Sequence, residues 1–339
     1  MRCQLKPIAE QTIVITGATS GIGLATARLA ASRGARLVLL ARDEQALERV
    51  ASELDASGQR VMWVTADVAD YSALQAAAAR AVERFGQIDT WINNAGVSIF
   101  GRHEEVSLED HRRLFETNYW GVVNGSLAAL PHLKANAQGT ALINLGSELS
   151  DVAVPLQGAY SASKHAVKGF TDSLRVELAE EGAAVSVTLI KPAAMDTPFT
   201  RHARNYMDVQ PKLPPPVYAP GIAAEAILVA ARNPRRDLYV GAASRLVSSA
   251  NKCAPAVMDL YLKTCMFSQQ RSDRPASGES GRLYAHGPQP AVTERGGEQH
   301  VMPFSPYTWA SAKAPVVSRL ALLGVACLVA GKLAGRKGR

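Results

Sequence analysis

Short apolar runs alternate with longer amphipathic stretches between residues 12 and 240, and this alternation restricts the fold more than any other feature. The apolar runs are predicted to be strands covered on both faces; they are residues 13–16, 36–40, 60–66, 90–93, 141–145, 185–190 and 237–240. The stretches 23–33, 43–56, 71–85, 108–133 and 159–181 have the spacing of helices. Strands that alternate with helices predict an α/β fold with a parallel, doubly wound sheet, whose ligands bind beyond the carboxyl ends of the strands.

The C-terminal part of the chain differs in composition from this body. Residues 271–339 contain ten Lys and Arg against four Asp and Glu, so they carry +6 of the net charge of +7. The nearly neutral body does not fit a nucleic-acid binder, whose basic residues form a patch on the folded domain. We predict a folded domain over residues 1–267, a polar linker or surface arm over 268–313, and an apolar helix with a basic end over 314–339.

Cysteine usage and the N-terminus indicate the compartment in which the protein folds. Four cysteines (Cys3, Cys253, Cys265 and Cys327) are scattered, and no histidine accompanies them at metal-ligand spacing. This pattern argues against a disulfide scaffold and against a zinc site, so no metal is predicted. No apolar run of signal-peptide length precedes the first strand, and the body is therefore expected to fold in a reducing cytoplasm.

The apolar C-terminal stretch has two interpretations. Residues 320–331 carry no charge, but at about 1.5 Å per residue they span only about 18 Å. Residues 314–334 reach about 31 Å and include Arg319 and Lys332 near their ends, where cationic side chains extend to lipid headgroups. The stretch predicts an anchor to the cytoplasmic face of a membrane. The alternative is a helix packed on the protein's own surface or on a subunit partner.

A glycine-rich turn follows the first predicted strand. Gly17, Gly21 and Gly23 have the spacing Gly-x-x-x-Gly-x-Gly and lead into a predicted helix. Glycines let the backbone approach a pyrophosphate, and a helix N-terminus offers free N–H groups and a positive dipole end. The turn predicts a dinucleotide site. A tight strand–helix connection without a ligand is the alternative.

Tyr160 and Lys164 lie four residues apart on a predicted helix and project from the same face. The ammonium is expected to favour the phenolate and so to lower the pKa of Tyr160 from about 10. Such a pair predicts a general acid/base, but a motif this short also arises by chance.

These motifs gain weight from their order along the chain. The glycine turn, Asn93-Asn94-Ala95-Gly96, Asn118, Ser147, Tyr160 and Lys164 together resemble the short-chain dehydrogenase/reductase family over about residues 10–200. The resemblance implies one Rossmann-type domain with a seven-stranded parallel sheet, a nicotinamide cofactor, and a homodimer or homotetramer that pairs the helices 108–133 and 159–181. The cofactor contacts expected from it are Thr16, Gly17, Ser20, Gly21, Ile22, Gly23, Arg42, Asp67, Val68, Asn94, Ala95, Gly96, Tyr160, Lys164, Pro192 and Thr197.

The resemblance also implies a role for each catalytic residue. Tyr160 is the acid/base, Ser147 orients the substrate oxygen, and Lys164 holds the nicotinamide ribose. Asn118 positions a water of the proton relay. Asp67 is expected to accept a hydrogen bond from the adenine amino group, and Thr197 to bond the nicotinamide carboxamide.

Two segments depart from the family pattern or vary within the family. Ala193 replaces the glycine that usually follows Pro192, which makes the local cofactor contacts less certain. Residues 198–220 are expected to close over the substrate, and such segments differ most between substrates.

The end of the second strand bears on the choice of cofactor. An NAD site usually has a carboxylate here that accepts the ribose 2′-hydroxyl. Ala41 removes that acceptor, and Arg42 offers a charge-assisted fork for a 2′-phosphate, so NADP is predicted over NAD. Asp43 follows directly, but it can equally cap the next helix.

The sequence therefore predicts an NADP-dependent oxidoreductase acting on a small-molecule carbonyl/alcohol pair. The alternative is a cofactor-binding regulatory or scaffold protein without turnover. Epimerisation or dehydration through the same hydride chemistry would need further acid/base residues, which the sequence does not identify. The substrate itself is not predicted.

Overall fold

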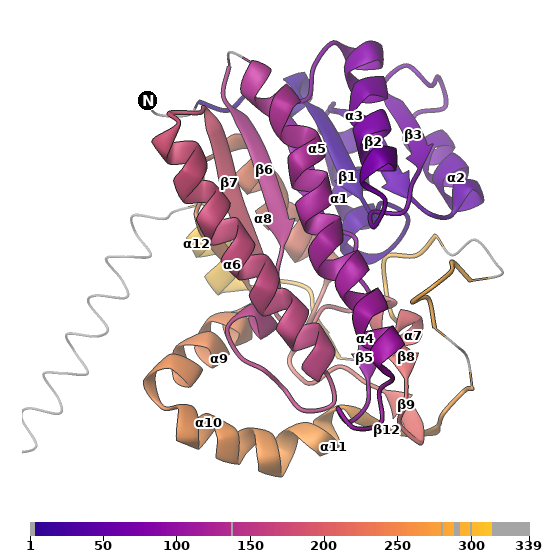
Figure 1. The fold of residues 1–339 in the computed structure, drawn as a ribbon, viewed down its shortest axis with the longest axis vertical. Helices are drawn as coiled ribbons and strands as arrows, with labels where there is room; N and C mark the ends of the chain where they lie inside the picture. Colours follow the sequence, from indigo (N-terminus) through magenta and orange to yellow (C-terminus); the bar gives the residue numbers. More distant parts are fainter. Residues whose placement is uncertain (1–3, 137, 279–280, 288–291, 299, 314–339) are drawn as a thin grey trace, which may run out of the picture.

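The computed structural model describes residues 4–136, 138–278, 281–287, 292–298 and 300–313. A parallel sheet of seven strands lies at its centre in the order β11-β7-β6-β4-β1-β2-β3 (Figure 1). The strands are β1 (Thr12–Thr16), β2 (Arg36–Ala41), β3 (Val61–Thr65), β4 (Thr90–Asn93), β6 (Thr140–Leu145), β7 (Val185–Pro192) and β11 (Asp237–Val240). This sheet confirms the predicted fold.

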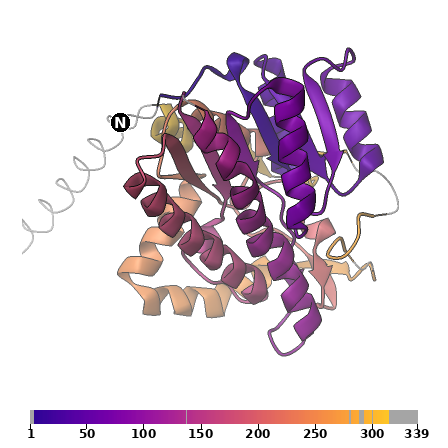
Figure 2. The ribbon, with the colours of Figure 1, turned by 45° about the horizontal axis from the view of Figure 1, so that its top comes forward.

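Three helices cover each face of the sheet (Figures 1 and 2). One face carries α1 (Gly21–Ser32), α2 (Glu44–Leu54) and α8 (Pro220–Arg232), and the other carries α3 (Tyr71–Phe85), α5 (Gly121–Ala135) and α6 (Gly158–Glu180). Ile13 and Ile15 point into the first layer and Val14 into the second, and all three are fully buried. Because both faces are covered, apolar side chains predominate on both faces of the strands.

Side-chain caps begin the helices that follow β2 and β3. Asp43 accepts a hydrogen bond from the Ala46 N–H at 3.0 Å and so caps α2. Asp70 caps α3 in the same way through the Ala73 N–H at 3.2 Å. Such caps satisfy N–H groups that the first helical turn leaves unbonded. Of the two roles considered for Asp43, the structure shows the cap.

The single helix expected over 108–133 is interrupted in the structure. It consists of α4 (Leu108–Phe115), the π-helical turn η2 (Glu116–Trp120) and α5. Its periodicity alone does not reveal the extra residue that a π-turn inserts. Such turns are frequent at functional sites, and this one contains Asn118.

The parallel strands β1 and β4 are neighbours at the centre of the sheet, and from them the strand order runs outward in opposite directions, through β2 and β3 on one side and through β6, β7 and β11 on the other. Ligands of doubly wound folds bind at such a reversal of strand order. The segments below this edge include α7 (Phe199–His202), β8 (Arg204–Asn205), β9 (Val209–Pro211), β10 (Val217–Tyr218), α9 (Ala242–Cys253), α10 (Pro255–Tyr261), η4 (Leu262–Met266) and α11 (Phe267–Gln269). In Figure 1 the helices α9, α10 and α11 run along the lower edge of the molecule. The short η1 (Ile8–Glu10), β5 (Ile99–Phe100), which pairs with β8, and η3 (Glu148–Ser150) complete the domain.

Much of the segment 268–313, interpreted from sequence as a linker or surface arm, pairs with the domain. β12 (Arg271–Pro275) is antiparallel to β9, and β13 (Val301–Met302) is parallel to β10. The helix α12 (Pro306–Lys313) contacts α8 and β11, and its Thr308 Oγ1 accepts a hydrogen bond from the Gly241 N–H at 2.8 Å.

The predicted membrane helix over 314–339 lies outside the described residues. Among the residues that the structure does describe, no helix combines the length and the apolar character needed to span a bilayer.

Candidate active site

A cavity lies beyond the carboxyl ends of the central strands. Its walls include Gly17, Ser20, Gly21, Ile22, Arg42, Asp67, Val68, Asn94, Ala95, Gly96, Ser147, Tyr160, Lys164, Pro192 and Thr197. The remaining predicted site residues, Thr16, Gly23 and Asn118, are not part of the wall. They support it from behind.

The glycine turn is shaped by its contacts with the end of β4. Thr16 Oγ1 accepts hydrogen bonds from the Asn94 and Ala95 N–H groups at 2.9 and 3.0 Å. Gly17 has a φ of +68°, and a Cβ at Gly23 would lie 2.1 Å from the Gly17 carbonyl oxygen. Only glycine allows this close turn, which places the start of α1 in the cavity wall. These residues fit a dinucleotide.

Polar side chains gather at the end of the cavity below β2 and β3. Asp67 binds Arg113 through its Oδ2 atom at 2.6 Å from Arg113 Nη2. Arg42 donates from Nη2 to the Arg282 carbonyl at 2.7 Å and from Nη1 to the Tyr284 carbonyl at 3.1 Å. Arg42 therefore borders the cavity, while part of its fork is used by the C-terminal segment.

At the opposite end, Thr197 and Ala193 follow β7. Thr197 lies against the glycine turn, since a Cβ at Gly21 would meet the Thr197 Cβ at 3.1 Å. Ala193 is buried, and its N–H donates to the Val240 carbonyl at 2.9 Å. The Ala193 backbone is not in the left-handed region, so alanine fits where the family usually has glycine.

The catalytic candidates Ser147, Tyr160 and Lys164 meet at this end of the cavity. Ser147 follows β6, and its Oγ accepts from the Leu149 N–H at 3.1 Å. Tyr160 and Lys164 lie one turn apart in α6, and Lys164 Nζ is 5.6 Å from the centre of the Tyr160 ring. The ammonium also donates to the Leu145 carbonyl at 2.7 Å, which anchors it at the end of β6.

Burial controls the titration of this group. It raises the pKa of Tyr160 well above its ordinary value, a hydrogen bond with Ser147 opposes this shift, and the charge of Glu148 adds to it. Burial also lowers the pKa of Lys164 to about 8. The lowering of the Tyr160 pKa that was expected from Lys164 is therefore outweighed by burial, which removes water from around the phenol and disfavours its charged form.

Asn118 is fully buried and holds two segments behind the cavity wall. Its Oδ1 accepts from the Val97 N–H at 2.8 Å, and its Nδ2 donates to the Val97 carbonyl at 2.9 Å and to Ser163 Oγ at 3.1 Å. A Cβ at Gly96 would lie 3.4 Å from Asn118 Oδ1 and 3.8 Å from Lys164 Nζ, so the amide and the ammonium approach the same point.

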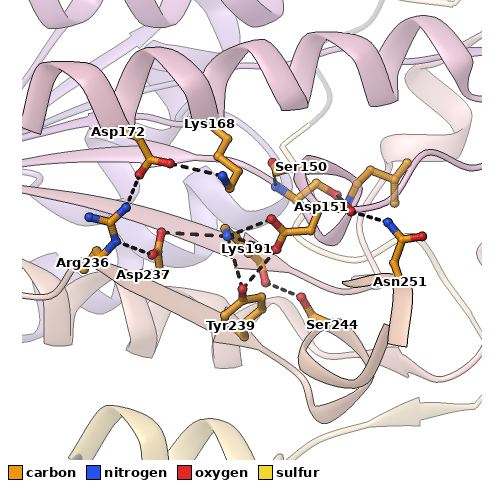
Figure 3. Close-up of polar contacts among 12 residues, drawn as sticks. Ser150, Asp151, Lys168, Asp172, Lys191, Arg236, Asp237, Tyr239, Ser244 and Asn251 are labelled. Atoms are coloured by element: carbon orange, nitrogen blue, oxygen red, sulfur yellow. Dashed lines mark hydrogen bonds and ion pairs between the residues drawn. The ribbon is translucent and has the colours of Figure 1, made fainter. Parts of the chain in front are cut away.

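A buried ion pair braces the strand end next to the cavity (Figure 3). Lys191 in β7 binds Asp151 at 3.0 Å, and the Tyr239 hydroxyl donates to the same carboxylate at 3.1 Å. Burial is the largest single influence and by itself would raise the Asp151 pKa and lower that of Lys191. The hydrogen bond between the two groups, the attraction of opposite charges and the neighbouring partners together outweigh burial in both. The pKa of Asp151 is therefore lowered and that of Lys191 raised. This pair ties the loop after Ser147 to the residue before Pro192.

Three parts of the cavity wall were not anticipated from the sequence. Glu148 faces the cavity beside Ser147, and burial raises its pKa to about 7. An apolar wall comes from Met258, Leu262 and Met266, whose spacing of four residues is a helical stripe visible in the sequence. Arg282 and His286 come from the C-terminal segment, where no periodicity points to a site.

This chain is similar to known oxidoreductases over most of its length. A family model described as short chain dehydrogenase matches residues 11–208. The uncharacterized oxidoreductase YxnA of Bacillus subtilis (strain 168) is 40% identical over 333 residues, which cover 98% of this chain and 93% of that protein. Dehydrogenase/reductase SDR family member 7B of Mus musculus is 38% identical over 200 residues, which cover 58% of this chain and 61% of that protein.

Solved structures show the same fold. A short-chain dehydrogenase/reductase from Burkholderia phymatum, in complex with NAD, is 28% identical with a TM-score of 0.65, covering 80% of this chain and 100% of that chain. An alcohol dehydrogenase from Thermococcus sibiricus, complexed with 5-hydroxy-NADP, is 29% identical with a TM-score of 0.59, covering 68% of this chain and 95% of that chain. The family match, the relatives and the solved structures agree with one another. The chain belongs to the short-chain dehydrogenase/reductase family, and it is an oxidoreductase acting on CH–OH groups.

Proposed function

We propose that the protein is an NADP-dependent oxidoreductase that interconverts a carbonyl and an alcohol, with Tyr160 as general acid/base. The observation that carries the proposal is one cavity with Ser147, Tyr160 and Lys164 at one end, Arg42 at the other, and the glycine turn between them. When bound, the nicotinamide cofactor supplies or removes the hydride. The protein contributes positioning and electrostatics.

Each catalytic side chain has a task that its surroundings support. Ser147 and Tyr160 share a hydrogen bond, so their hydroxyls can converge on one substrate oxygen. Tyr160 then gives or takes the proton of that oxygen. Lys164 brings a positive charge beside the phenol and donors for the ribose hydroxyls. The approach of Asn118 and Lys164 to one point supports a relay of protons behind Tyr160.

The preference for NADP rests on the end of β2. Ala41 offers no carboxylate, and Asp43 Oδ1 is committed to capping α2. Relatives of known structure bind NAD in one case and an NADP derivative in another, so the chain's own residues carry the argument. Arg42 has five N–H donors, and its bonds to the Arg282 and Tyr284 carbonyls do not use all of them.

Direct titration tests this preference. Wild-type protein should bind NADPH more tightly than NADH, as measured by the fluorescence of the reduced nicotinamide. Ala41→Asp should shift the preference toward NADH by restoring a ribose acceptor while leaving the Arg42 contacts in place. Equal affinities of the wild type for the two cofactors would contradict the role of Arg42.

Turnover distinguishes an enzyme from a cofactor-binding scaffold. The apolar wall of Met258, Leu262 and Met266 favours ketones and alcohols with an apolar body. A panel of such substrates, together with aldehydes and xenobiotic carbonyls, should reveal NADPH oxidation or NADP reduction. Tight cofactor binding with no turnover of any member of the panel would favour the scaffold.

Membrane attachment remains a proposal that rests on residues 314–334 alone. The structure refines its test, because α12 packs on α8 and β11 and belongs to the domain. A version ending at Lys313 keeps these contacts. If full chain and shortened version fractionate equally without detergent, the anchor does not exist.

A further inference from the structure

Glu148 has a carboxylate in the cavity wall that no group of the described part of the protein binds. The residue directly follows Ser147 and lines the same cavity as Tyr160. Neither a backbone N–H nor a side chain of the described residues donates to it or pairs with it, and burial is the cause of its raised pKa. A carboxylate withdrawn from bulk water needs a donor, so its partner comes from whatever fills the cavity.

The other two carboxylates of the described cavity wall are engaged within the protein. Asp67 binds Arg113 at 2.6 Å, below β2 and β3. Asp43 accepts from the Ala46 N–H at 3.0 Å and so caps α2. Both lie at the far end of the cavity from the catalytic candidates. Glu148 is therefore the carboxylate of the described wall that is left for a ligand.

The C-terminal segment makes its polar contacts on the cofactor side of the cavity. Residues 281–287 and 292–298, here called the arm, lie beyond the part of the chain that matches the family model. Arg42 donates to the Tyr284 carbonyl at 3.1 Å, and the Gly21 N–H donates to the Thr293 carbonyl at 2.9 Å. These contacts lie at the end of β2 and at the glycine turn, whereas the carboxylate next to Ser147 is on the substrate side.

The turn that carries Glu148 is held in place on both sides. Ser147 Oγ accepts from the Leu149 N–H at 3.1 Å, and Ser150 Oγ accepts from the Ser147 N–H at 3.1 Å. Asp151 follows directly and joins the turn to β7 through its buried ion pair (Figure 3). These bonds fix the position of Glu148 beside the proposed catalytic serine, as a binding group requires.

Apolar side chains line the same end of the cavity and pack against the ring of Tyr160. They are Leu149, Val152, Val154, Met258, Leu262 and Met266. A substrate that contacts this wall displaces water from it. If that substrate has no donor, the carboxylate of Glu148 loses water without gaining a partner, which weakens binding. A substrate with a hydroxyl or amino group supplies the partner, and such a site discriminates strongly against the analogue that lacks the group.

We propose that Glu148 accepts a hydrogen bond from a hydroxyl or amino group of the substrate, so that the substrates are hydroxy- or amino-ketones with an apolar body and the corresponding alcohols. The proposal rests on the function proposed above, since it takes the oxygen held by Ser147 and Tyr160 as the reacting oxygen. Because Glu148 directly follows Ser147, the donor belongs within a few bonds of the reacting carbon.

Matched sets of ketones test the proposal on the full chain. Each set has an apolar ketone and its derivatives with a hydroxyl or an amino group on a neighbouring carbon. NADPH oxidation gives kcat/KM, and the selectivity is the value for the derivative divided by that for the plain ketone. In Glu148→Leu this selectivity should fall by at least about tenfold from that of the wild type. Differences in ketone reactivity, effects on Tyr160 and a loss of folded enzyme all cancel in this comparison.

A second variant distinguishes the two donors. Glu148→Gln keeps an acceptor oxygen and removes the negative charge. Selectivity for a hydroxyl derivative should be largely kept in this variant, because a neutral hydrogen bond remains. Selectivity for an amino derivative, which carries an ammonium, should fall as far as in Glu148→Leu. Either result supports the proposal and identifies the donor.

Gln269→Leu is the matched control. Gln269 also lines the cavity, but its Oε1 already accepts from the Tyr261 hydroxyl at 3.1 Å, so its selectivity should equal that of the wild type. Unchanged selectivity in Glu148→Leu, or an equal fall in the control, overturns the proposal while the proposed function stands. If the wild type reduces none of the ketones, the proposed function fails, and this inference fails with it.

Discussion

At the scale of the residue, burial and the charge of Glu148 raise the pKa of Tyr160, so the phenol stays protonated; only the hydrogen bond with Ser147 opposes this. Tyr160→Phe removes the transferable proton and should lower kcat by about 10²–10⁴-fold. The NADPH dissociation constant should stay nearly unchanged. Lys164→Ala should impair both quantities, because it removes a ribose donor as well as the charge beside the ring. Steady-state kinetics with fluorescence titration checks both variants, and a Tyr160→Phe enzyme with most of its rate would refute the mechanism.

Glu148 gives the site a second titrating group at neutral pH. Its carboxyl has a pKa of about 7 because of burial, and its negative charge raises the pKa of Tyr160. As the pH rises through 7, the carboxylate forms and keeps Tyr160 protonated, which disfavours alcohol oxidation. Glu148→Gln should therefore speed oxidation above pH 7, by about tenfold for each unit by which the Tyr160 pKa falls, and change little below pH 6. Superimposable pH profiles of kcat for oxidation would exclude this coupling.

At the scale of the element, the pair of Lys191 and Asp151 joins β7 to the loop after Ser147, and both side chains are only 3% exposed. Lys191→Met leaves a buried carboxylate without its partner and should lower the free energy of unfolding by about 3–5 kcal/mol. The double variant with Asp151→Asn should lose less, because no unpaired charge remains. Urea unfolding of the three proteins measures this. A double variant less stable than Lys191→Met would show that the buried charge is not the cause.

This pair also has a defined dependence on pH. The pKa of Asp151 is lowered in the folded protein, so its contribution to stability is complete above the unfolded value of about 3.9. It is lost as the pH falls through the folded pKa. In acid the difference in stability between wild type and Lys191→Met should therefore shrink.

The arm and α2 each supply a carboxylate to the same Arg28 side chain. Glu294 of the arm and Glu53 of α2 both lie 2.7 Å from it. If the arm forms the outer wall of the cofactor site, Glu294→Gln should speed NADPH release by about two- to fivefold, the range of a surface ion pair. Glu53→Gln removes the other carboxylate partner of Arg28 and leaves Glu294 in place, so it should not change the rate of NADPH release. Stopped-flow displacement compares them, and equal rates would contradict the role of the arm in retention.

At the scale of the whole molecule, exposed apolar side chains on α5 and α6 support the proposed oligomer. Leu127 is 44% exposed and Val176 is 65% exposed, on the helices that the resemblance to the family predicts to pair between subunits. Wild-type protein should be a dimer or tetramer by light scattering, and Leu127→Glu with Val176→Glu should dissociate it. Leu246→Glu on α9, at a similarly exposed apolar residue, is the control and should leave the oligomer intact. A monomeric wild type would contradict the proposal.

Local patterns were sufficient to predict the sheet and most of the cavity wall. Strands such as Arg36–Ala41 carry apolar side chains on both faces because helices cover both faces. The carboxyl ends of the strands bring Ser147 and the glycine turn to one cavity. The π-turn at Asn118 was missed because one inserted residue barely alters a helical period. The arm was missed because its docking depends on backbone carbonyls and single side chains, which leave no period in the sequence.

The arm also has a consequence for how the protein is made. Synthesis proceeds from the N-terminus, and domains generally fold as their segments emerge. The last strand of the central sheet ends at Val240, whereas the partners of Arg42 and Asp196 follow at residues 282–298. A nascent chain therefore has its sheet and Tyr160 before it has the part of the cavity wall that Arg282 and His286 supply. The wall of the cavity is therefore completed by residues that are synthesised after the whole central sheet.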